Sequence, residues 1–183
     1  ILYAPTWDDG ESASSFFKIA PLLAEQLPDD YNLIVKPHPM LEEHHPAQYY
    51  ITSSLFDKKS NAIVMNDHFP IFPLLENVDI YLGDFSSIGY DFLTFNRPLF
   101  FFNQKNIEKG SPSLYLHKCG VTIPTTSYTN IFSFIAKHTD PWPNNLLNNQ
   151  KETYKFTFGD DPNFLQIKTN ILSAYNTWLT NKN

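Results

Sequence analysis

Cysteine and glycine are both scarce in this sequence of 183 residues, and each shortage excludes classes of protein. The one cysteine, Cys119, cannot form an internal disulfide or a cysteine-based zinc site, which is consistent with a reducing compartment. The six glycines form no G-x-G-x-x-G fingerprint and no Walker loop, and G-x-S-x-G and H-E-x-x-H motifs are also missing. These absences argue against NAD enzymes, P-loop NTPases and serine hydrolases.

Long apolar runs and an excess of positive charge are missing as well. No apolar stretch approaches the roughly 20 residues that a membrane-spanning helix needs. The formal net charge of -6 gives no basic footprint for duplex nucleic acid, although a local positive site could still hold a phosphate. The sequence opens at Ile1, without methionine and inside a strand-like run, so we expect a segment of a longer polypeptide.

Short apolar runs alternate with longer amphipathic ones, and this alternation predicts the fold class. Strands are expected over residues 1–7, 31–37, 62–66, 78–84, 98–103 and 120–124, where β-branched and aromatic residues gather. Helical spacing occupies residues 14–27, 41–56, 69–78 and 87–95. We expect Pro21 to kink or delay its helix and Pro46 to split its segment. The pattern predicts an α/β fold with a doubly wound parallel sheet.

The C-terminal part departs from this alternation. An amphipathic segment covers residues 128–138, and an Asn- and Pro-rich connector is predicted over residues 140–150. A final helix is expected near residues 164–179, with an apolar stripe made of Phe164, Ile167, Ile171, Leu172, Tyr175 and Leu179. Such a stripe is expected to pack on the domain. We therefore predict one domain over residues 1–183, with residues 140–183 forming a connector and a helix that packs on it.

The candidate site lies where the predicted strands end. In open α/β sheets, ligands bind beyond the carboxyl ends of the strands, where helix N-termini present free amides. Thr6 and Asp8 follow the first run, and the stretch Lys36-Pro37-His38-Pro39 follows the second. Asp67 and His68 follow the third run, and the junction Asp84-Phe85-Ser86-Ser87 follows the fourth. We expect all four stretches at one edge of the sheet.

Two of these stretches suit a phosphate. Ser86 and Ser87 are small hydroxyl residues at the start of a helix, where one can cap the helix and the other can donate to an anion. Plain capping of a surface helix explains the same pair. His38 stands between two prolines that fix its backbone, so its imidazole could donate to a phosphate oxygen or move a proton. Each residue also has an interpretation without a ligand. His38 could simply bond a nearby carbonyl, and Lys36 could be a solvated charge at the strand end.

Other polar groups give weaker signals. His44 and His45 are adjacent and would project about 100° apart on a helix, so a shared metal centre is not expected there. His68 could flank the same cleft or cap the next segment. Asp91, on the helix after the two serines, could bond a ligand hydroxyl or face water. We predict no metal and no cofactor.

Three motifs in order resemble the CDP-glycerol glycerophosphotransferase family, which polymerises glycerol phosphate in teichoic acids and related capsules. They are ILYAPTW, KPHP and VDIYLGDFSSIGYDFLTFNRPLFFF, which together span roughly residues 1–102. The resemblance implies the C-terminal, donor-binding half of a GT-B fold, in which two Rossmann-like domains face each other across a cleft. It implies a cytoplasmic transferase whose contact with the membrane would come only through parts outside this chain.

The resemblance also implies roles for individual residues. His38 matches the family histidine that contacts the phosphates of the donor and supports transfer, and Ser86 and Ser87 match the paired hydroxyls at the phosphate-facing helix start. Asp84 and Asp91 match the acidic positions that flank the serines, which we assign to the nucleotide or the alditol. Thr6 matches the threonine of the first loop, and with Lys36 it completes the expected phosphate-binding set.

Departures from the family pattern bear on specificity and on activity. Asp8 stands where family members commonly have a basic residue, and the stretch after the last apolar run has Lys109-Gly110 in place of their Arg-Gly pair. The acceptor-binding domain and its catalytic base are absent from these residues, so we expect the fragment alone to bind donor without turnover. The polymer acceptor would contact that missing domain.

The expected reaction is attack of an acceptor hydroxyl on the β-phosphorus of a CDP-alditol, with release of CMP. Two alternatives stay open from the sequence. One is a UDP-sugar-dependent GT-B glycosyltransferase or epimerase that uses the same phosphate site. The other is a non-catalytic nucleotide-binding module, which the altered stretch after residue 103 favours and the retained KPHP and DFSS motifs disfavour.

Overall fold

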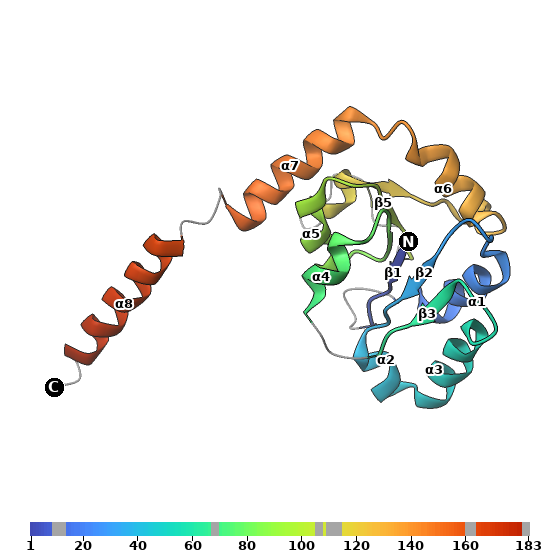
Figure 1. Cartoon of the computed structure of the whole chain (residues 1–183), viewed down its shortest axis with the longest axis horizontal. Coiled ribbons are helices and arrows are strands. Elements are labelled where there is room, and N and C mark those ends of the chain that lie inside the picture. The colour runs from blue at the N-terminus through green and yellow to red at the C-terminus, as the bar shows by residue number, and fades with distance from the viewer. Residues whose placement is uncertain (9–13, 67–69, 105–107, 109–114, 160–163, 181–183) are drawn as a thin grey trace.

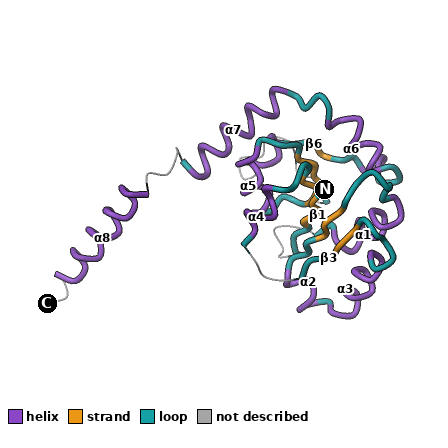
Figure 2. Tube along the Cα trace, viewed as in Figure 1, coloured by secondary structure: helices purple, strands orange, loops and turns teal. Residues whose placement is uncertain are grey.

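The computed structural model describes residues 1–8, 14–66, 70–104, 108, 115–159 and 164–180. Its centre is a six-stranded parallel sheet in the order β3-β2-β1-β4-β5-β6 (Figures 1 and 2). The strands are β1 (Leu2–Ala4), β2 (Leu33–Val35), β3 (Ala62–Val64), β4 (Tyr81–Gly83), β5 (Leu99–Phe101) and β6 (Val121–Thr122). Each of the six lies within a run that the sequence predicts as a strand, so the α/β class and the parallel sheet are confirmed.

Helices cover both faces of the sheet. They are α1 (Phe16–Gln26), α2 (Pro39–His44), α3 (Pro46–Ser53), α4 (Ile71–Glu76), α5 (Ser87–Phe92), α6 (Ile131–Thr139), α7 (Asn144–Phe158) and α8 (Phe164–Thr180). Short 3-10 turns are η1 (Ser54–Phe56), η2 (Leu93–Phe95), η3 (Tyr115–Cys119) and η4 (Thr125–Ser127). In Figure 1, α1, α2 and α3 lie on one side of the strands, and α4 and α5 lie on the other. The doubly wound arrangement follows from this division.

Alternating side chains of the strands build a separate hydrophobic core on each face. Tyr3 and Phe100 point to the face of α1 and α6, whereas Leu2 and Phe101 point to the face of α4, α5 and η3. All four side chains are fully buried. Strands β1, β4 and β5 are buried throughout, and burial on both faces explains why their sequences are almost continuously apolar.

The two prolines inside predicted helices have different effects. Pro46 separates α2 from α3, as expected, and occupies the first position of α3, where a missing amide hydrogen costs nothing. Pro21 lies inside α1, which starts at Phe16 and continues to Gln26. The expected delay of this helix is therefore wrong, because the buried face made by Ile19, Ala20 and Leu23 outweighs one lost hydrogen bond.

Most of the expected connector over residues 140–150 is instead the first part of α7. The helix begins after Pro143, whose fixed backbone angle suits a helix start. Its asparagines are weak helix formers, so packing decides the outcome. Gln150 and Thr153 are buried between η2 and η3, and the amide nitrogen of Gln150 donates to the carbonyl oxygens of Arg97 and Cys119.

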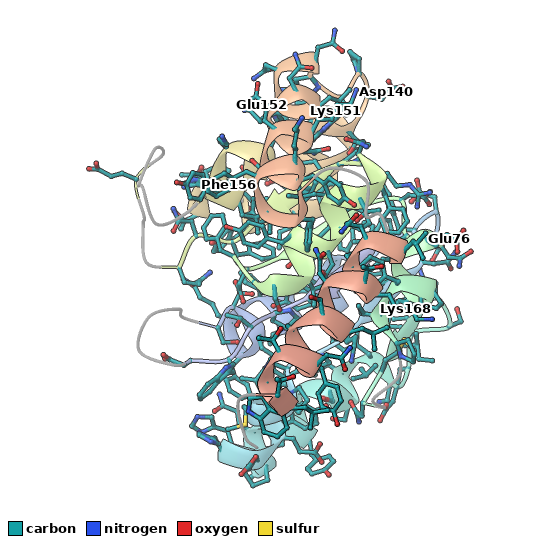
Figure 3. The ribbon with its side chains drawn as sticks, turned by 90° about the vertical axis from the view of Figure 1, so that its left-hand side faces the viewer. Glu76, Asp140, Lys151, Glu152, Phe156 and Lys168 are labelled. Carbon is teal, nitrogen blue, oxygen red and sulfur yellow. The ribbon has the colours of Figure 1, made fainter. Side chains whose placement is uncertain are left out.

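The expected packing of the last helix on the domain is not found among the described residues. Helix α8 stands clear of the sheet in Figure 1, and Ile171 is 63% exposed and Tyr175 53% exposed. Figure 3 views this side of the molecule, with Phe156 on the outside of α7 and Lys168 on α8. The stripe predicts an amphipathic helix but does not identify the surface that covers it. Among the described helices, none is long and apolar enough to span a bilayer.

Candidate functional site

The candidate site lies at the carboxyl edge of the sheet, where the strand order reverses. Strand β1 has β2 on one side and β4 on the other, so the crossovers that leave β1 and β4 run to opposite faces. Ligands in doubly wound sheets bind at this switch point. The loops after β1, β2 and β4 therefore converge on one place, although their residues are far apart in the sequence.

These three loops enclose a cavity of about 290 Å³. Five of the predicted site residues line it, namely Thr6, Lys36, His38, Ser86 and Ser87. Pro37 and Pro39 on either side of the histidine line it too, and Trp7 and Phe85 contribute aromatic walls. A cation, an imidazole and three hydroxyls thus face one small space, and this set of donors suits an anion.

His38 is held by the start of helix α2. It occupies the N-cap position in an extended conformation, and its Nδ1 accepts a hydrogen bond of 3.2 Å from the amide of Met40. In the neutral imidazole, a ring nitrogen that accepts carries no proton, so the proton resides on Nε2. The fold thereby sets the tautomer and leaves Nε2 as the donating atom of the ring.

Trp7 is a site residue that the sequence analysis did not select. Its indole stacks on the ring of His38, with ring centroids 6.0 Å apart and planes 24° apart, and it meets His44 edge-on. The indole separates the main cavity from a smaller one of about 120 Å³ lined by His44 and His45. Its place in the run ILYAPTW indicated only the end of a strand. The stack joins the loops after β1 and β2, so neither segment alone predicts it.

Ser86 does not cap its helix in the ordinary way. It occupies the N-cap position of α5 in an extended conformation, yet its side chain makes no capping bond. Its hydroxyl instead lies 3.1 Å from the hydroxyl of Tyr81, a fully buried side chain of β4. Ser87, the first residue of α5, is exposed at the mouth of the cavity.

Asp84 lies beneath the cavity rather than in its wall. Its Oδ2 accepts hydrogen bonds of 3.0 Å from the amides of Thr6 and Ser15, which ties the loop after β1 and the start of α1 to the end of β4. Among the described residues Oδ1 has no hydrogen-bond partner. Burial raises the pKa of Asp84 to about 7, against the lowering effect of the amides of Ser15 and Thr6 and of the Ser15 side chain. The carboxylate supports the site and is not placed to touch a ligand in the cavity.

Asp91 is not among the residues that line the cavity. It is half-buried on α5, and burial raises the pKa of its carboxyl. His68, Lys109 and Gly110 lie outside the described residues. The described part of the chain holds no group of three or more acidic, histidine or cysteine side chains that could bind a metal ion.

A larger groove of about 530 Å³ runs beside the edge strand β3, lined by Tyr50, Lys59 and Ile63 among others. None of the strand-end residues that converge at the switch point lines it. The smaller cavity therefore has the stronger claim to be a ligand site, because it combines the switch-point position with several donors.

The fold and the cavity define an α/β domain whose switch point suits a phosphorylated ligand. Comparison with known proteins identifies the family as well. The family described as CDP-glycerol:poly(glycerophosphate) glycerophosphotransferase matches residues 1–115. The chain belongs to this family, and the match contains all three loops of the cavity.

The chain is similar to two curated teichoic acid enzymes over part of their length. The teichoic acid glycerol-phosphate primase of Bacillus subtilis (strain 168) is 31% identical over 103 residues, which cover 56% of this chain and 25% of the primase. The teichoic acid poly(glycerol phosphate) polymerase of Bacillus spizizenii is 32% identical over 108 residues, with the same two shares. The chain therefore matches about a quarter of the length of these relatives.

A variant of the wall teichoic acid polymerase TagF has a similar structure, with a TM-score of 0.62 at 19% identity. The match covers 100% of this chain and 44% of the TagF chain. At this identity the likeness supports the fold alone.

Proposed function

We propose that this chain is the donor-binding part of a CDP-glycerol glycerophosphotransferase that extends a cell-envelope polymer. Membership of the family and the two curated relatives support this activity. In this proposal the chain is a single Rossmann-like domain, the C-terminal half of a GT-B fold. The acceptor-binding domain and any membrane contact belong to parts of the polymerase outside these 183 residues, and the reaction takes place in the cytoplasm.

The observation that carries the proposal is the convergence of Lys36, His38 and Ser86 on one cavity from three separate loops. A pyrophosphate carries its negative charge on oxygens that accept hydrogen bonds, and all three side chains can donate. Thr6 and Ser87 add two further hydroxyls to the same walls. Helix α5 has six residues, so its dipole is small and the side chains would do most of the binding.

The proposed reaction is a phosphoryl transfer without a covalent enzyme intermediate. A hydroxyl oxygen of the polymer attacks the β-phosphorus of CDP-glycerol and forms a new phosphodiester bond. The bond between this phosphorus and the bridging oxygen breaks, and that oxygen leaves on CMP. His38 donates through Nε2 to a phosphate oxygen, where extra negative charge is stabilised during the transfer. The proton of the acceptor hydroxyl would pass to a base in the missing domain.

Calorimetric titration of the 183-residue chain tests the donor directly. We expect saturable binding of CDP-glycerol that is stronger than binding of a UDP-sugar, with CDP-ribitol as the comparison for the alditol. Tighter binding of a UDP-sugar would favour the glycosyltransferase or epimerase reading. Absence of binding by every one of these nucleotides would contradict the proposed function.

Replacing His38 with asparagine separates a role at the phosphate from a role at the helix. Asparagine is a good N-cap residue and can accept the Met40 amide in place of Nδ1, but it has no counterpart of Nε2. In the full-length polymerase we expect turnover to fall about 100-fold or more, with little change in the unfolding temperature. His45→Asn is the control, because His45 also occupies an N-cap position, that of α3, makes no side-chain capping bond there and lies outside the main cavity. An unchanged rate of CMP release by His38→Asn would remove His38 from the reaction.

A further inference from the structure

A buried tyrosine lies directly beneath the candidate phosphate site. Tyr81 belongs to β4, its side chain is fully buried, and its hydroxyl reaches the turn at the start of α5. Gly83 makes room for it, since a Cβ at position 83 would lie 2.8 Å from the hydroxyl oxygen and 2.5 Å from the carbonyl oxygen of Ala4. The sequence around Tyr81 predicts no function for its hydroxyl, and Tyr81 does not line the cavity.

The hydroxyl of Tyr81 has three possible hydrogen-bond partners but only one proton to donate. Its oxygen lies 3.1 Å from the carbonyl oxygen of Asp84, 3.4 Å from that of Ala4 and 3.1 Å from Oγ of Ser86. The two carbonyls can only accept, whereas a hydroxyl can both donate and accept. When Tyr81 donates to a carbonyl, Ser86 must donate to Tyr81 to keep their bond. When Tyr81 donates to Ser86, the proton of Ser86 is released for another acceptor.

We propose that Tyr81 is a positioning residue for the donor phosphate, and that it acts by donating to Ser86 so that Ser86 can donate to a phosphate oxygen. The inference rests on the proposed function, because it concerns the same cavity. The exchange between the two arrangements requires only rotation of two O–H groups, with no movement of heavier atoms. An anion in the cavity selects the arrangement in which Ser86 points its proton outward.

Two features of the structure support this role over plain packing. Ser86 is the N-cap of α5, yet its side chain makes no capping bond, so its hydroxyl is not committed to the helix. Its oxygen is shared between the buried tyrosine and the cavity that it lines. Burial also raises the pKa of Tyr81, so its hydroxyl stays protonated and can keep donating at neutral pH.

The test is a double-mutant cycle on CDP-glycerol binding by the 183-residue chain, measured by calorimetry. We expect Tyr81→Phe to weaken binding about fivefold, the effect of one net hydrogen bond. In the Ser86→Ala background, the same change should have no further effect, because the residue through which Tyr81 acts is gone. A purely structural role of the hydroxyl would give an equal loss in both backgrounds.

Tyr3→Phe is the matched control. Tyr3 is also fully buried, on the neighbouring strand β1, and its hydroxyl lies 2.8 Å from Oγ of Ser15, which does not line the cavity. Removing this hydroxyl should alter the unfolding temperature as Tyr81→Phe does, and leave CDP-glycerol binding unchanged. Equal weakening of binding by both substitutions would overturn the assignment to Tyr81.

A measurement on the intact hydroxyl covers the case in which Tyr81→Phe does not fold. A fluorine placed on the ring of Tyr81 by incorporation of 3-fluorotyrosine should report a changed 19F resonance when CDP-glycerol saturates the chain, and no change in the Ser86→Ala background. A resonance unmoved in both would overturn the inference alone. Absence of CDP-glycerol binding by the unmodified chain would overturn the proposed function and this inference together.

Discussion

At the scale of single residues, Asp84 is a buried carboxyl whose charged form is costly. It is 3% exposed, two backbone amides donate to one oxygen, and its other oxygen has no hydrogen-bond partner among the described residues. An ionised carboxyl that is buried and half satisfied is expensive, so the protonated form is favoured at a pH where an exposed aspartate is charged. The consequence is a link between pH and the stability of the loops around the cavity.

We expect the chain to lose stability as the pH rises through neutrality, and Asp84→Asn to lose less. The pKa of Asp84 is about 7 in the folded chain and near 3.8 when exposed, so between these values the folded state holds a proton that the unfolded state has released. This contribution is fully present below pH about 4 and lost as the pH passes 7, on the order of 1–3 kcal/mol.

Urea unfolding of both proteins at pH 5 and pH 8 measures this contribution. The free energy of unfolding of the natural chain should fall relative to that of Asp84→Asn as the pH rises. Parallel pH profiles for the two proteins would show that Asp84 keeps an ordinary affinity for protons.

Residue types at strand ends were enough to predict most of the cavity wall. Thr6, Lys36, His38 and the two serines each follow an apolar run, and parallel strands bring such positions to one edge. Trp7 and Tyr81 could not be predicted in the same way. Their importance comes from contacts with His38 and Ser86, and no short sequence pattern encodes these contacts.

At the scale of elements, buried polar side chains attach α7 to the domain, and Gln150 makes two of the bonds. Gln150 is fully buried, and its amide nitrogen donates to the carbonyl oxygens of Arg97, 3.1 Å away, and Cys119, 2.9 Å away. These bonds attach the helix to the chain on either side of β5. The helix is therefore attached by polar contacts inside a small buried patch, which its Asn-rich sequence does not reveal.

We expect Gln150→Ala to destabilise the chain by about 1–3 kcal/mol, because a buried carbonyl oxygen of Cys119 and a partly buried one of Arg97 lose their donor. Asn148→Ala, an exposed change on the same helix, should cost less than about 0.5 kcal/mol. The free energy of urea unfolding measures both. Equal effects of the two substitutions would show that α7 is held by its apolar contacts alone.

Elements with a simple apolar pattern were predictable, and elements held by polar contacts were not. The central strands β1, β4 and β5 are apolar and buried on both faces, and their apolar runs can be recognised in the sequence without knowing which strands pair with them. Helix α7 carries a weak pattern and starts inside a stretch that resembles a loop. Its existence depends on the space between η2 and η3, which only the folded chain provides.

At the scale of the whole molecule, α8 contributes little to the stability of the domain. Its apolar side chains from Leu165 onward are exposed, including Leu165 at 74% and Trp178 at 51%. A chain that ends at Gly159 should therefore unfold within about 2 °C of the full chain, because residues 165–180 bury no side chain. Thermal unfolding by circular dichroism checks this. A drop of many degrees would show that α8 packs on the domain in solution, as its stripe predicted.

Trp7 lines the cavity, so the fluorescence of its indole can report on the site. The sequence has three tryptophans, and of these Trp7 stacks on the ring of His38 and lines the cavity, while Trp142 and Trp178 lie elsewhere. Indole emission is sensitive to a charged imidazole and to water at its face. With Trp142 and Trp178 replaced by phenylalanine, the remaining fluorescence would follow both the protonation of His38 and the arrival of a nucleotide, without any attached dye.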